Sequence, residues 1–175
     1  MKREFILYIA MSLDGYIARK DGSIDWLSGH EDVEEDIGYE EFLSNIDTVI
    51  MGRTTYEQII HELSVDVWPY ENQKSYVITS KSQPTSEHVT FVQDIEELIH
   101  KLQKEAGKGI WIVGGSKIVS YFMEQQLIDQ FQIAIMPTIL GEGIPLFSYK
   151  GEECPLRLVE SKAVNGITLQ TYRRR

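Results

Sequence analysis

Short apolar runs rich in β-branched and aromatic residues recur along the first three quarters of the chain. Several of them lack the polar–apolar alternation of a half-exposed strand. Such runs are typical of strands that are buried on both faces of a sheet. We predict strands at residues 5–11, 48–51, 75–79, 109–113 and 130–136, with a weaker one at 89–92.

Helical patterns separate these runs. The clearest is 94–106, where apolar residues recur at helical spacing behind Asp94, a residue type that caps helices. We predict further helices at 31–45, 54–61 and 116–126.

The last quarter of the chain contains two predicted strands, 156–160 and 166–172, around an Asn165-Gly166 turn. Asn-Gly is a strong hairpin signal, so these strands should be antiparallel. Together with the alternation of strands and helices before it, this predicts a single α/β domain over residues 1–175. The expected fold has three layers: a central, mostly parallel mixed sheet, helices on both faces, and a C-terminal antiparallel β-hairpin.

The amino-acid composition limits which classes of molecule the protein can bind. Of the 175 residues, 27 are acidic and 17 basic, giving a net charge of -10, which argues against nucleic acid because its phosphates would be repelled. The single cysteine, Cys154, excludes an internal disulfide and paired-cysteine zinc ligands, and we predict no metal site. The apolar stretch 5–11 is too short for a leader or a membrane helix. We therefore expect a cytoplasmic protein without a membrane partner.

Candidate chemistry gathers where predicted strands run into glycine and small polar residues. Two such junctions are 114–117 (Gly-Gly-Ser-Lys) and 52–54 (Gly-Arg-Thr). Ligands of open α/β sheets bind at the carboxyl ends of the strands, and helices that begin there point N–H groups at anions. Both junctions could therefore hold phosphate. The alternatives are a tight structural turn for the glycine pair and a surface ion pair for Arg53.

Two other segments carry weaker signals. Residues 79–81 (Thr-Ser-Lys) could hold a second phosphate, although a turn is the simpler interpretation. The loop after the first strand, which contains Asp14 and Trp26, has the composition of a lid over a cleft. Asp14 could close a turn in this loop or approach a substrate, and Trp26 could lie in the core or stack on a ligand.

Four of these motifs occur along the chain in an order that resembles the order in a known superfamily. Ser-Leu-Asp-Gly-Tyr-Ile-Ala at 12–18, Met-Gly-Arg-Thr-Thr-Tyr-Glu at 51–57, Ile-Thr-Ser-Lys at 78–81 and Ile-Val-Gly-Gly-Ser at 112–116 follow one another. In this order they resemble the dihydrofolate reductase superfamily. With the segment 137–147, the chain is more closely similar to the C-terminal reductase domain of the riboflavin-biosynthesis deaminase-reductase (the RibD C-terminal domain) in a stand-alone bacterial form.

The resemblance implies that NADPH lies across the ends of the strands. Ala10 and Ile17 would line the nicotinamide pocket, and Ser80 and Lys81 would lie by the adenosine 2′-phosphate. The superfamily also carries a cis peptide bond between its paired glycines, so we predict one at Gly114–Gly115. The full set of expected cofactor-binding residues is Ala10, Ile17, Gly52, Arg53, Thr54, Thr79, Ser80, Lys81, Gly114, Gly115, Ser116 and Lys117.

The resemblance also suggests a catalytic residue. Dihydrofolate reductases hold their substrate with a buried carboxylate on the first helix, and counting back from Gly52 places Asp36 there. Its acidic neighbours allow a solvated helix face instead. Asp14 and Trp26 are the other candidate substrate contacts. Ile-Asp-Trp-Leu at 24–27 replaces the Pro-Trp of true folate reductases, which argues against dihydrofolate.

The expected function is therefore an NADPH-dependent reductase of a small heterocyclic substrate, most like 5-amino-6-(5-phosphoribosylamino)uracil reductase. The sparse basic residues near the proposed cleft are unfavourable for a phosphorylated substrate. The alternatives are a non-catalytic nucleotide-binding or regulatory protein on the same fold, and a dihydrofolate or pterin reductase. By the same resemblance we expect a homodimer through the late strands, where Phe131, Ile133 and Ile135 alternate.

Overall fold

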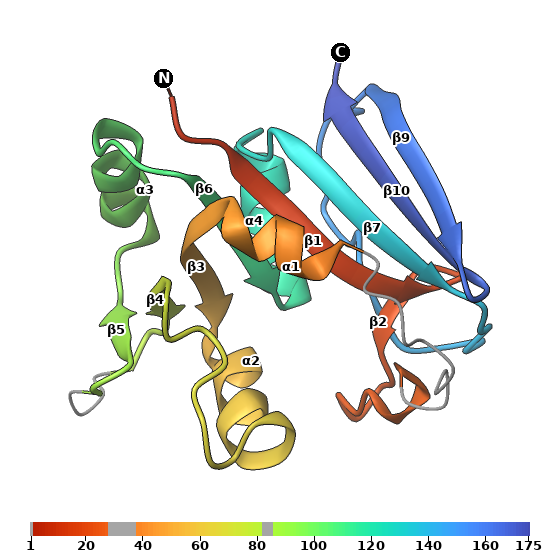
Figure 1. The fold of residues 1–175 in the computed structure, drawn as a ribbon, viewed down its shortest axis with the longest axis horizontal. Coiled ribbons are helices and arrows are strands. Elements are labelled where there is room, and N and C mark those ends of the chain that lie inside the picture. The colour runs from red at the N-terminus through yellow and green to blue at the C-terminus, as the bar shows by residue number, and fades with distance from the viewer. Residues whose placement is uncertain (1, 28–37, 82–85) are drawn as a thin grey trace.

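A computed structural model describes residues 2–27, 38–81 and 86–175, and in these ranges one eight-stranded sheet forms the centre of the molecule (Figure 1). Its order is β5-β4-β3-β6-β1-β7-β10-β9. Neighbours from β5 to β7 are parallel, and β10 pairs antiparallel with both β7 and β9. The strands are β1 (Phe5–Ser12), β3 (Ile46–Gly52), β4 (Lys74–Ile78), β5 (Val89–Val92), β6 (Gly109–Gly114), β7 (Gln130–Met136), β9 (Leu156–Val164) and β10 (Ile167–Arg174). The short strands β2 (Tyr16–Ala18) and β8 (Ile144–Pro145) pair separately.

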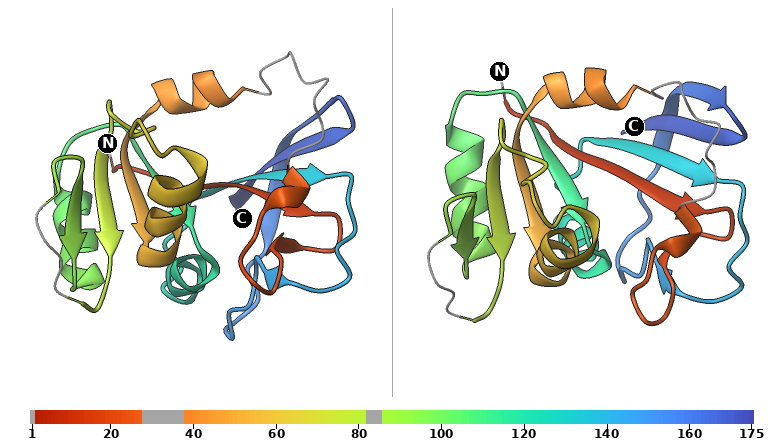
Figure 2. Two further views of the ribbon diagram at one scale, coloured as in Figure 1. Left: turned by 90° about the horizontal axis from the view of Figure 1, so that it is seen from below. Right: turned by 60° about the horizontal axis from the view of Figure 1, so that its bottom comes forward.

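The helices lie on both faces of this sheet, as the alternating pattern predicts (Figure 2). They are α1 (Tyr39–Ser44), α2 (Arg53–Gln58), which continues into a π-helical turn over Ile59–Leu63, α3 (Ile95–Lys104) and α4 (Ser116–Glu124). Buried side chains of α3 and α4 share one core cluster, and those of α1 and the turn after α2 share another on the opposite face. Within the described ranges, no helix is long and apolar enough to span a membrane.

Short sequence signals correctly predicted the start of α3 and the turn of the C-terminal hairpin. The Asp94 carboxylate accepts a hydrogen bond from the Glu97 N–H at 2.9 Å, and this confirms the predicted cap of α3. Asn165 and Gly166 have φ angles of 50° and 81°, as a tight hairpin turn requires. Both hairpin strands end later than predicted. Helix α1 begins at Tyr39, after Gly38 with a φ of 99°, and covers only the end of the predicted helix 31–45; residues 31–37 of that prediction lie outside the described ranges.

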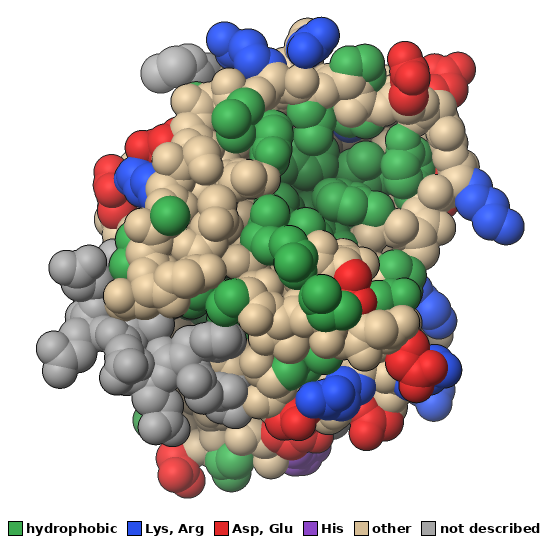
Figure 3. All heavy atoms as spheres, turned by 90° about the vertical axis from the view of Figure 1, so that its right-hand side faces the viewer, with side chains coloured by type: hydrophobic (Ala, Val, Ile, Leu, Met, Phe, Trp, Pro, Cys, Tyr) green, Lys and Arg blue, Asp and Glu red, His purple; other side chains and the backbone are tan. Residues whose placement is uncertain are grey.

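The C-terminal hairpin has two different faces. Cross-strand pairs such as Tyr172–Leu158 and Gln170–Ser161 lie on the face that also holds Phe131 of β7, and their side chains are uncharged. Leu158 is 52% exposed there. Figure 3 views this side of the molecule and shows apolar side chains gathered in a hollow.

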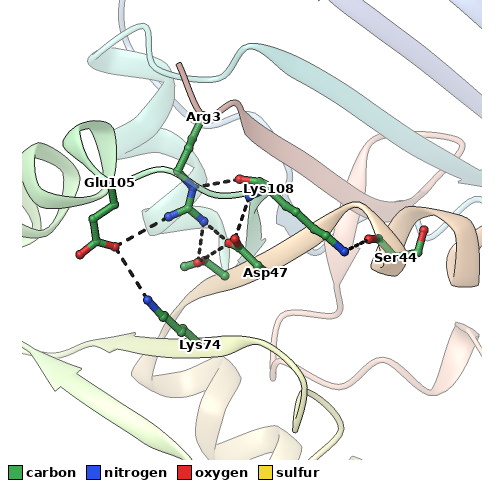
Figure 4. A network of polar contacts seen from close by, with 7 residues as sticks. Arg3, Ser44, Asp47, Lys74, Glu105 and Lys108 are labelled. Atoms are coloured by element: carbon green, nitrogen blue, oxygen red, sulfur yellow. Dashed lines mark hydrogen bonds and ion pairs between the residues drawn. The ribbon is translucent and has the colours of Figure 1, made fainter. Parts of the chain in front are cut away.

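A polar network joins the amino-terminal ends of several strands (Figure 4). The Arg3 side chain is buried; it pairs with the Asp47 carboxylate and donates to Thr48 Oγ1 at 2.7 Å and to the Lys108 carbonyl at 2.9 Å. The Lys108 N–H in turn donates to Asp47 Oδ2 at 2.7 Å. The network ties the start of β1 to the start of β3 and to the loop before β6, at the edge of the sheet opposite the predicted ligand site.

Candidate functional site

Two of the predicted glycine junctions meet at the carboxyl edge of the sheet. Strands β3 and β6 are parallel neighbours, and Met51 pairs with Gly114, so the ends of both strands lie side by side. A β-carbon on Gly52 would stand 3.9 Å from the Gly114 carbonyl oxygen, and one on Gly115 would stand 3.5 Å from Thr55 Oγ1. The chain therefore brings together backbone segments more than 60 residues apart in the sequence.

The peptide bond between Gly114 and Gly115 is cis, which confirms the prediction. Gly114 has a φ of 128°, a conformation that residues with a side chain rarely adopt. Helix α4 begins at the next residue, Ser116. The first N–H groups of a helix have no intrahelical partner, so Ser116 and Lys117 present donors and a positive dipole end at this edge.

Arg53 lies at the junction of β3 and α2, as predicted. Its Nε donates to Glu57 Oε1 at 2.6 Å, one helical turn further on. The ion pair that the sequence offered as an alternative is therefore present. Both side chains remain partly exposed, and within the described ranges this pair occupies only the Nε of the guanidinium.

Residues 79–81 form a turn after β4. The Thr79 N–H donates to the Val92 carbonyl at 2.9 Å, and the Thr79 hydroxyl accepts from the Lys81 N–H at 3.2 Å. Thr79 is buried, whereas Ser80 and Lys81 are exposed. Lys81 lines a groove of about 590 Å³ that lies along β5 and α3.

The Asp14 carboxylate ties two loops together. It accepts hydrogen bonds from the Ser12 hydroxyl at 2.6 Å, from the Leu140 N–H at 3.1 Å and from the Gly141 N–H at 2.7 Å. These bonds, the Ser12 hydroxyl foremost, hold the pKa of Asp14 below its usual range. The contacts match the turn-closing alternative, and a substrate contact by Asp14 stays a prediction.

Trp26 is buried in a small apolar cluster on the β1–β7–β10 part of the sheet. It packs with Ala134, Met136, Ile167 and Leu169, and only 6% of the residue is exposed. Its indole Nε1 has no hydrogen-bond partner among the described residues. Trp26 is therefore a core residue that also carries an unused buried donor.

The two predicted nicotinamide contacts do not share one cluster. Ala10 packs against the Trp26 cluster, whereas Ile17 packs against the cluster under α3 and α4. The predicted catalytic residue, Asp36, lies outside the described residues, and its role stays a prediction.

An aromatic group next to Ala10 was missed by the sequence reasoning. The Tyr8 ring stacks on Phe42 with centroids 4.4 Å apart, and Trp111 meets both rings edge-on. The Trp111 Nε1 donates to the Tyr8 carbonyl at 2.9 Å, and burial raises the pKa of the neighbouring Tyr39. Tyr8 lies two residues before Ala10 on one strand, so both point to the same face; this period-2 spacing was the available signal.

Known proteins share both this sequence and this architecture. The family model of the RibD C-terminal domain matches residues 3–169. An uncharacterized protein of Bacillus subtilis strain 168, YwjB, is 45% identical over 164 residues, which are 93% of this chain and 92% of YwjB.

Three solved structures are similar to this one. A candidate riboflavin biosynthesis protein from Shewanella sp. PV-4 has a TM-score of 0.84 at 29% identity, over 100% of this chain and 99% of that one. A Thermotoga maritima diaminohydroxyphosphoribosylaminopyrimidine deaminase/5-amino-6-(5-phosphoribosylamino)uracil reductase has a TM-score of 0.73 at 19% identity, over 99% of this chain and 57% of that one. Enterococcus faecalis dihydrofolate reductase, complexed with NADP(H), has a TM-score of 0.68 at 19% identity, over 99% of both chains.

The last two similarities concern the fold alone, while the family model and YwjB span nearly the whole chain. The chain therefore belongs to the RibD C-terminal domain family and has a dihydrofolate reductase-like α/β fold.

Proposed function

We propose that the chain is an NADPH-dependent reductase that transfers a hydride to a small heterocyclic substrate, most like 5-amino-6-(5-phosphoribosylamino)uracil. The observation that carries the proposal is the contact between the Gly52 and Gly114–Gly115 junctions at one edge of the sheet. Without side chains at these points, a phosphate backbone can approach the main chain closely. Family membership supports the proposal, because the Thermotoga structure bears the name of such a reductase.

The described residues at this edge fit a phosphorylated dinucleotide. Ser116 and Lys117 open α4, where N–H groups and the helix dipole favour an anion. Arg53 beside them can donate from its Nη groups, and we assign the pyrophosphate to these three residues. The exposed Ser80 and Lys81 follow the next strand along the sheet and are assigned to the adenosine 2′-phosphate.

Reduced nicotinamide, when bound, supplies the hydride. The chain's own contribution is to orient the reacting rings and to exclude water. Ala10 borders the apolar Trp26 cluster, against which a flat heterocycle can lie. A carbonyl group on that heterocycle would satisfy the buried indole N–H of Trp26, because an unpaired buried donor is costly.

One observation favours the non-catalytic alternative. The Asp14 carboxylate is occupied by Ser12, Leu140 and Gly141. The Trp26 cluster, as far as the described residues show, contains no acid. A nucleotide-binding protein without turnover would need no proton donor there.

Oxidation of NADPH against single substrates tests the proposal. The panel contains 5-amino-6-(5-phosphoribosylamino)uracil, its dephosphorylated form and dihydrofolate, and NADPH binding is measured in parallel by calorimetry. Substrate-dependent oxidation supports the reductase. Binding of NADPH without turnover of any compound favours the regulatory alternative, and absence of NADPH binding contradicts both.

We also propose that the hollow on the C-terminal hairpin is covered by a second copy of this chain. On this face of the hairpin, the cross-strand partners in β9 and β10 between residues 158 and 172 have uncharged side chains. The charged residues Arg157, Glu160 and Lys162 lie on the opposite face. Two chains with a net charge of -10 repel one another, so an uncharged face is the surface over which association costs least. Exposed contiguous apolar surface of this kind marks interaction sites.

Sedimentation velocity tests the dimer. Leu158→Glu puts a charge on this face of the hairpin and should yield monomers. The matched substitution Lys162→Glu, on the opposite face of the same strand, should leave the dimer intact. A wild-type monomer across the micromolar range would contradict the proposal.

A further inference from the structure

A second groove lies at the edge of the sheet opposite the predicted cofactor site. Its volume is about 450 Å³, within the range of small-molecule sites. Arg173 of β10 pairs with Gln130 at the start of β7, so β10 ends at the amino-terminal edge of the parallel strands (Figure 1). The groove is lined by residues from the segments 123–126, 149–155 and 174–175, which are the end of α4, the loop before β9 and the end of the described chain.

The Arg174 guanidinium in this groove has one bonded side and one unused side. Its Nη1 donates to the Gln126 carbonyl at 2.6 Å. Its Nε and Nη2 are buried, and neither has a hydrogen-bond partner among the described residues. Within the same residues Arg174 forms no ion pair. Because an unpaired buried donor is costly, and a charged one more so, this side of the guanidinium needs an acceptor.

The turn after α4 fixes the position of the guanidinium. The Gln126 N–H donates to the Met123 carbonyl at 3.0 Å and the Leu127 N–H to the Phe122 carbonyl at 2.9 Å. In this helix-ending motif the residue at the position of Gln126 is usually glycine, and Gln126 has a φ of 53°. The turn places the Gln126 carbonyl against Nη1, which leaves Nε and Nη2 for another group.

The unused side of the guanidinium is the one that carries Nε and Nη2. The N–H bonds of these two atoms point in parallel, a geometry that matches two oxygens of one carboxylate or phosphate. A single carbonyl oxygen would satisfy only one of them well. The missing partner is therefore a group with two acceptor oxygens.

The other charges in the groove favour a carboxylate over a phosphate. Its two arginines are outnumbered by three glutamates, Glu124, Glu152 and Glu153. Helix α4 also ends at Glu124, and the last carbonyls of a helix carry the negative end of its dipole. These charges oppose a dianionic phosphate. They tolerate one carboxylate paired with Arg174, and they favour a positive charge elsewhere on the same ligand.

The remaining walls of the groove are partly apolar. Met123 is buried, and Tyr149 and Cys154 are half-buried. The Tyr149 hydroxyl donates to the Glu152 carbonyl and closes the loop. The Tyr149 ring packs so closely on Gly151 that a β-carbon there would stand 2.7 Å from it. These side chains offer a surface for an aliphatic or aromatic group.

We propose that this groove binds a small zwitterion with one carboxylate, one ammonium group and an apolar part, the chemistry of a neutral amino acid. The carboxylate accepts two hydrogen bonds from Arg174, the ammonium group lies toward the glutamates, and the apolar part lies against Met123 and Tyr149. Because Nε and Nη2 are buried, the ligand displaces an exposed side chain of the loop to reach them, and side-chain changes of this kind are common on binding. None of the residues assigned to the cofactor lines this groove, so the inference is independent of the proposed function.

Calorimetric titration of the wild-type protein without NADPH tests the ligand class. The probes are L-leucine, 4-methylpentanoate, which lacks the ammonium group, 3-methylbutylamine, which lacks the carboxylate, and inorganic phosphate. L-Leucine should bind at least about tenfold more tightly than each of the others, because only it satisfies both signs of charge. Absence of L-leucine binding at millimolar concentration overturns the proposal. Phosphate binding as tight as that of L-leucine also overturns it.

Three single variants test the residues. Arg174→Lys keeps the charge but loses the parallel donors, and should weaken L-leucine at least about tenfold. Arg157→Lys, the same change at an exposed arginine of β9 outside the groove, should leave the affinity unchanged. Glu153→Gln should weaken L-leucine but not 4-methylpentanoate. Equal affinities of the Arg174 and Arg157 variants would overturn the assignment, and thermal melting shows whether each variant retains the fold.

Cys154 provides a readout that needs no variant. It is the single cysteine of the chain and lines the groove, so iodoacetamide can report on this place alone. Bound L-leucine should slow the alkylation of Cys154, measured by mass spectrometry, whereas 3-methylbutylamine at the same concentration should not. An alkylation rate unchanged by saturating L-leucine would place its binding outside the groove and overturn the proposal.

Discussion

The carboxylate of Asp14 accepts a hydrogen bond from the Gly141 N–H at 2.7 Å, and this bond ties the loop after β1 to the loop after β7. Both loops border the predicted nicotinamide side of the sheet. The Leu13 N–H also donates to the Thr138 carbonyl at 2.8 Å, so the ionised Asp14 side chain reinforces a backbone contact between the two loops.

Protonation of Asp14 should loosen this tie. Its pKa is lowered in the folded protein by the Ser12 hydroxyl first and by the loop N–H groups, so folding favours the ionised form. The stabilisation is thus present above the ordinary Asp pKa of about 3.9 and is lost as pH falls through the lower, folded value. An NMR titration of the carboxyl carbon should show the lowered pKa, and Asp14→Asn should abolish the pH dependence of the Gly141 amide shift. An ordinary pKa would contradict this account.

The Arg3 network should contribute more to stability than an exposed ion pair. Arg3→Met removes the partner of Asp47 and the donors to Thr48 and Lys108, and should lower the free energy of unfolding by about 3 kcal/mol. Lys20→Met removes the exposed pair with Glu142 and should cost less than about 1 kcal/mol. Urea unfolding of both variants checks the contrast, and equal losses would refute it.

A substitution at Gly107 offers a second test of the Arg3 network. A β-carbon at this position would stand 2.5 Å from Asp47 Oδ2 and 3.0 Å from the Arg3 Cζ. Gly107→Ala should therefore displace the ion pair and lower the melting temperature, although alanine is usually tolerated on a surface loop. A melting temperature equal to that of the wild type would show that the loop shifts without disturbing the pair.

The glycine junctions should be intolerant of branched side chains. Gly52→Val places its β-carbon 3.2 Å from Ile118 Cγ1 and 3.9 Å from the Gly114 carbonyl, so it pushes α4 and the glycine pair away from the position to which we assign the cofactor. NADPH affinity should fall more than about tenfold by calorimetry. Circular dichroism should show a retained fold. An unchanged NADPH affinity in a folded variant would contradict the assignment of the cofactor to this edge of the sheet.

Trp26→Phe should distinguish the packing role of the Trp26 ring from a role of its indole N–H in substrate binding. The ring remains in the apolar cluster, and the unpartnered donor disappears, so the free energy of unfolding should change by less than about 1.5 kcal/mol. If the indole N–H contacts substrate, KM should rise while NADPH affinity stays constant. A change in NADPH affinity alone would place Trp26 on the cofactor side.

The sequence was informative wherever one physical rule acts over a short distance. The cap at Asp94, the turn at Asn165-Gly166 and the buried strands follow from side-chain chemistry and hydrophobic period within a few residues. The C-terminal bound of β10 was underestimated, because pairing with β7 extends to Arg173 and pairing with β9 extends to Arg174, beyond the strand's own apolar pattern.

The sequence also predicted which residues of the cofactor edge could bind phosphate, because glycine allows close approach to the main chain and Arg53 and the serines supply hydrogen-bond donors. Tertiary structure alone decided which of these residues meet. The parallel pairing of β3 with β6 brings Gly52 to Gly114, whereas Ala10 and Ile17 pack into separate clusters. It also placed α3 and α4 over one shared core cluster, because the position of a helix on the sheet depends on packing between residues far apart in the chain, which no local pattern encodes.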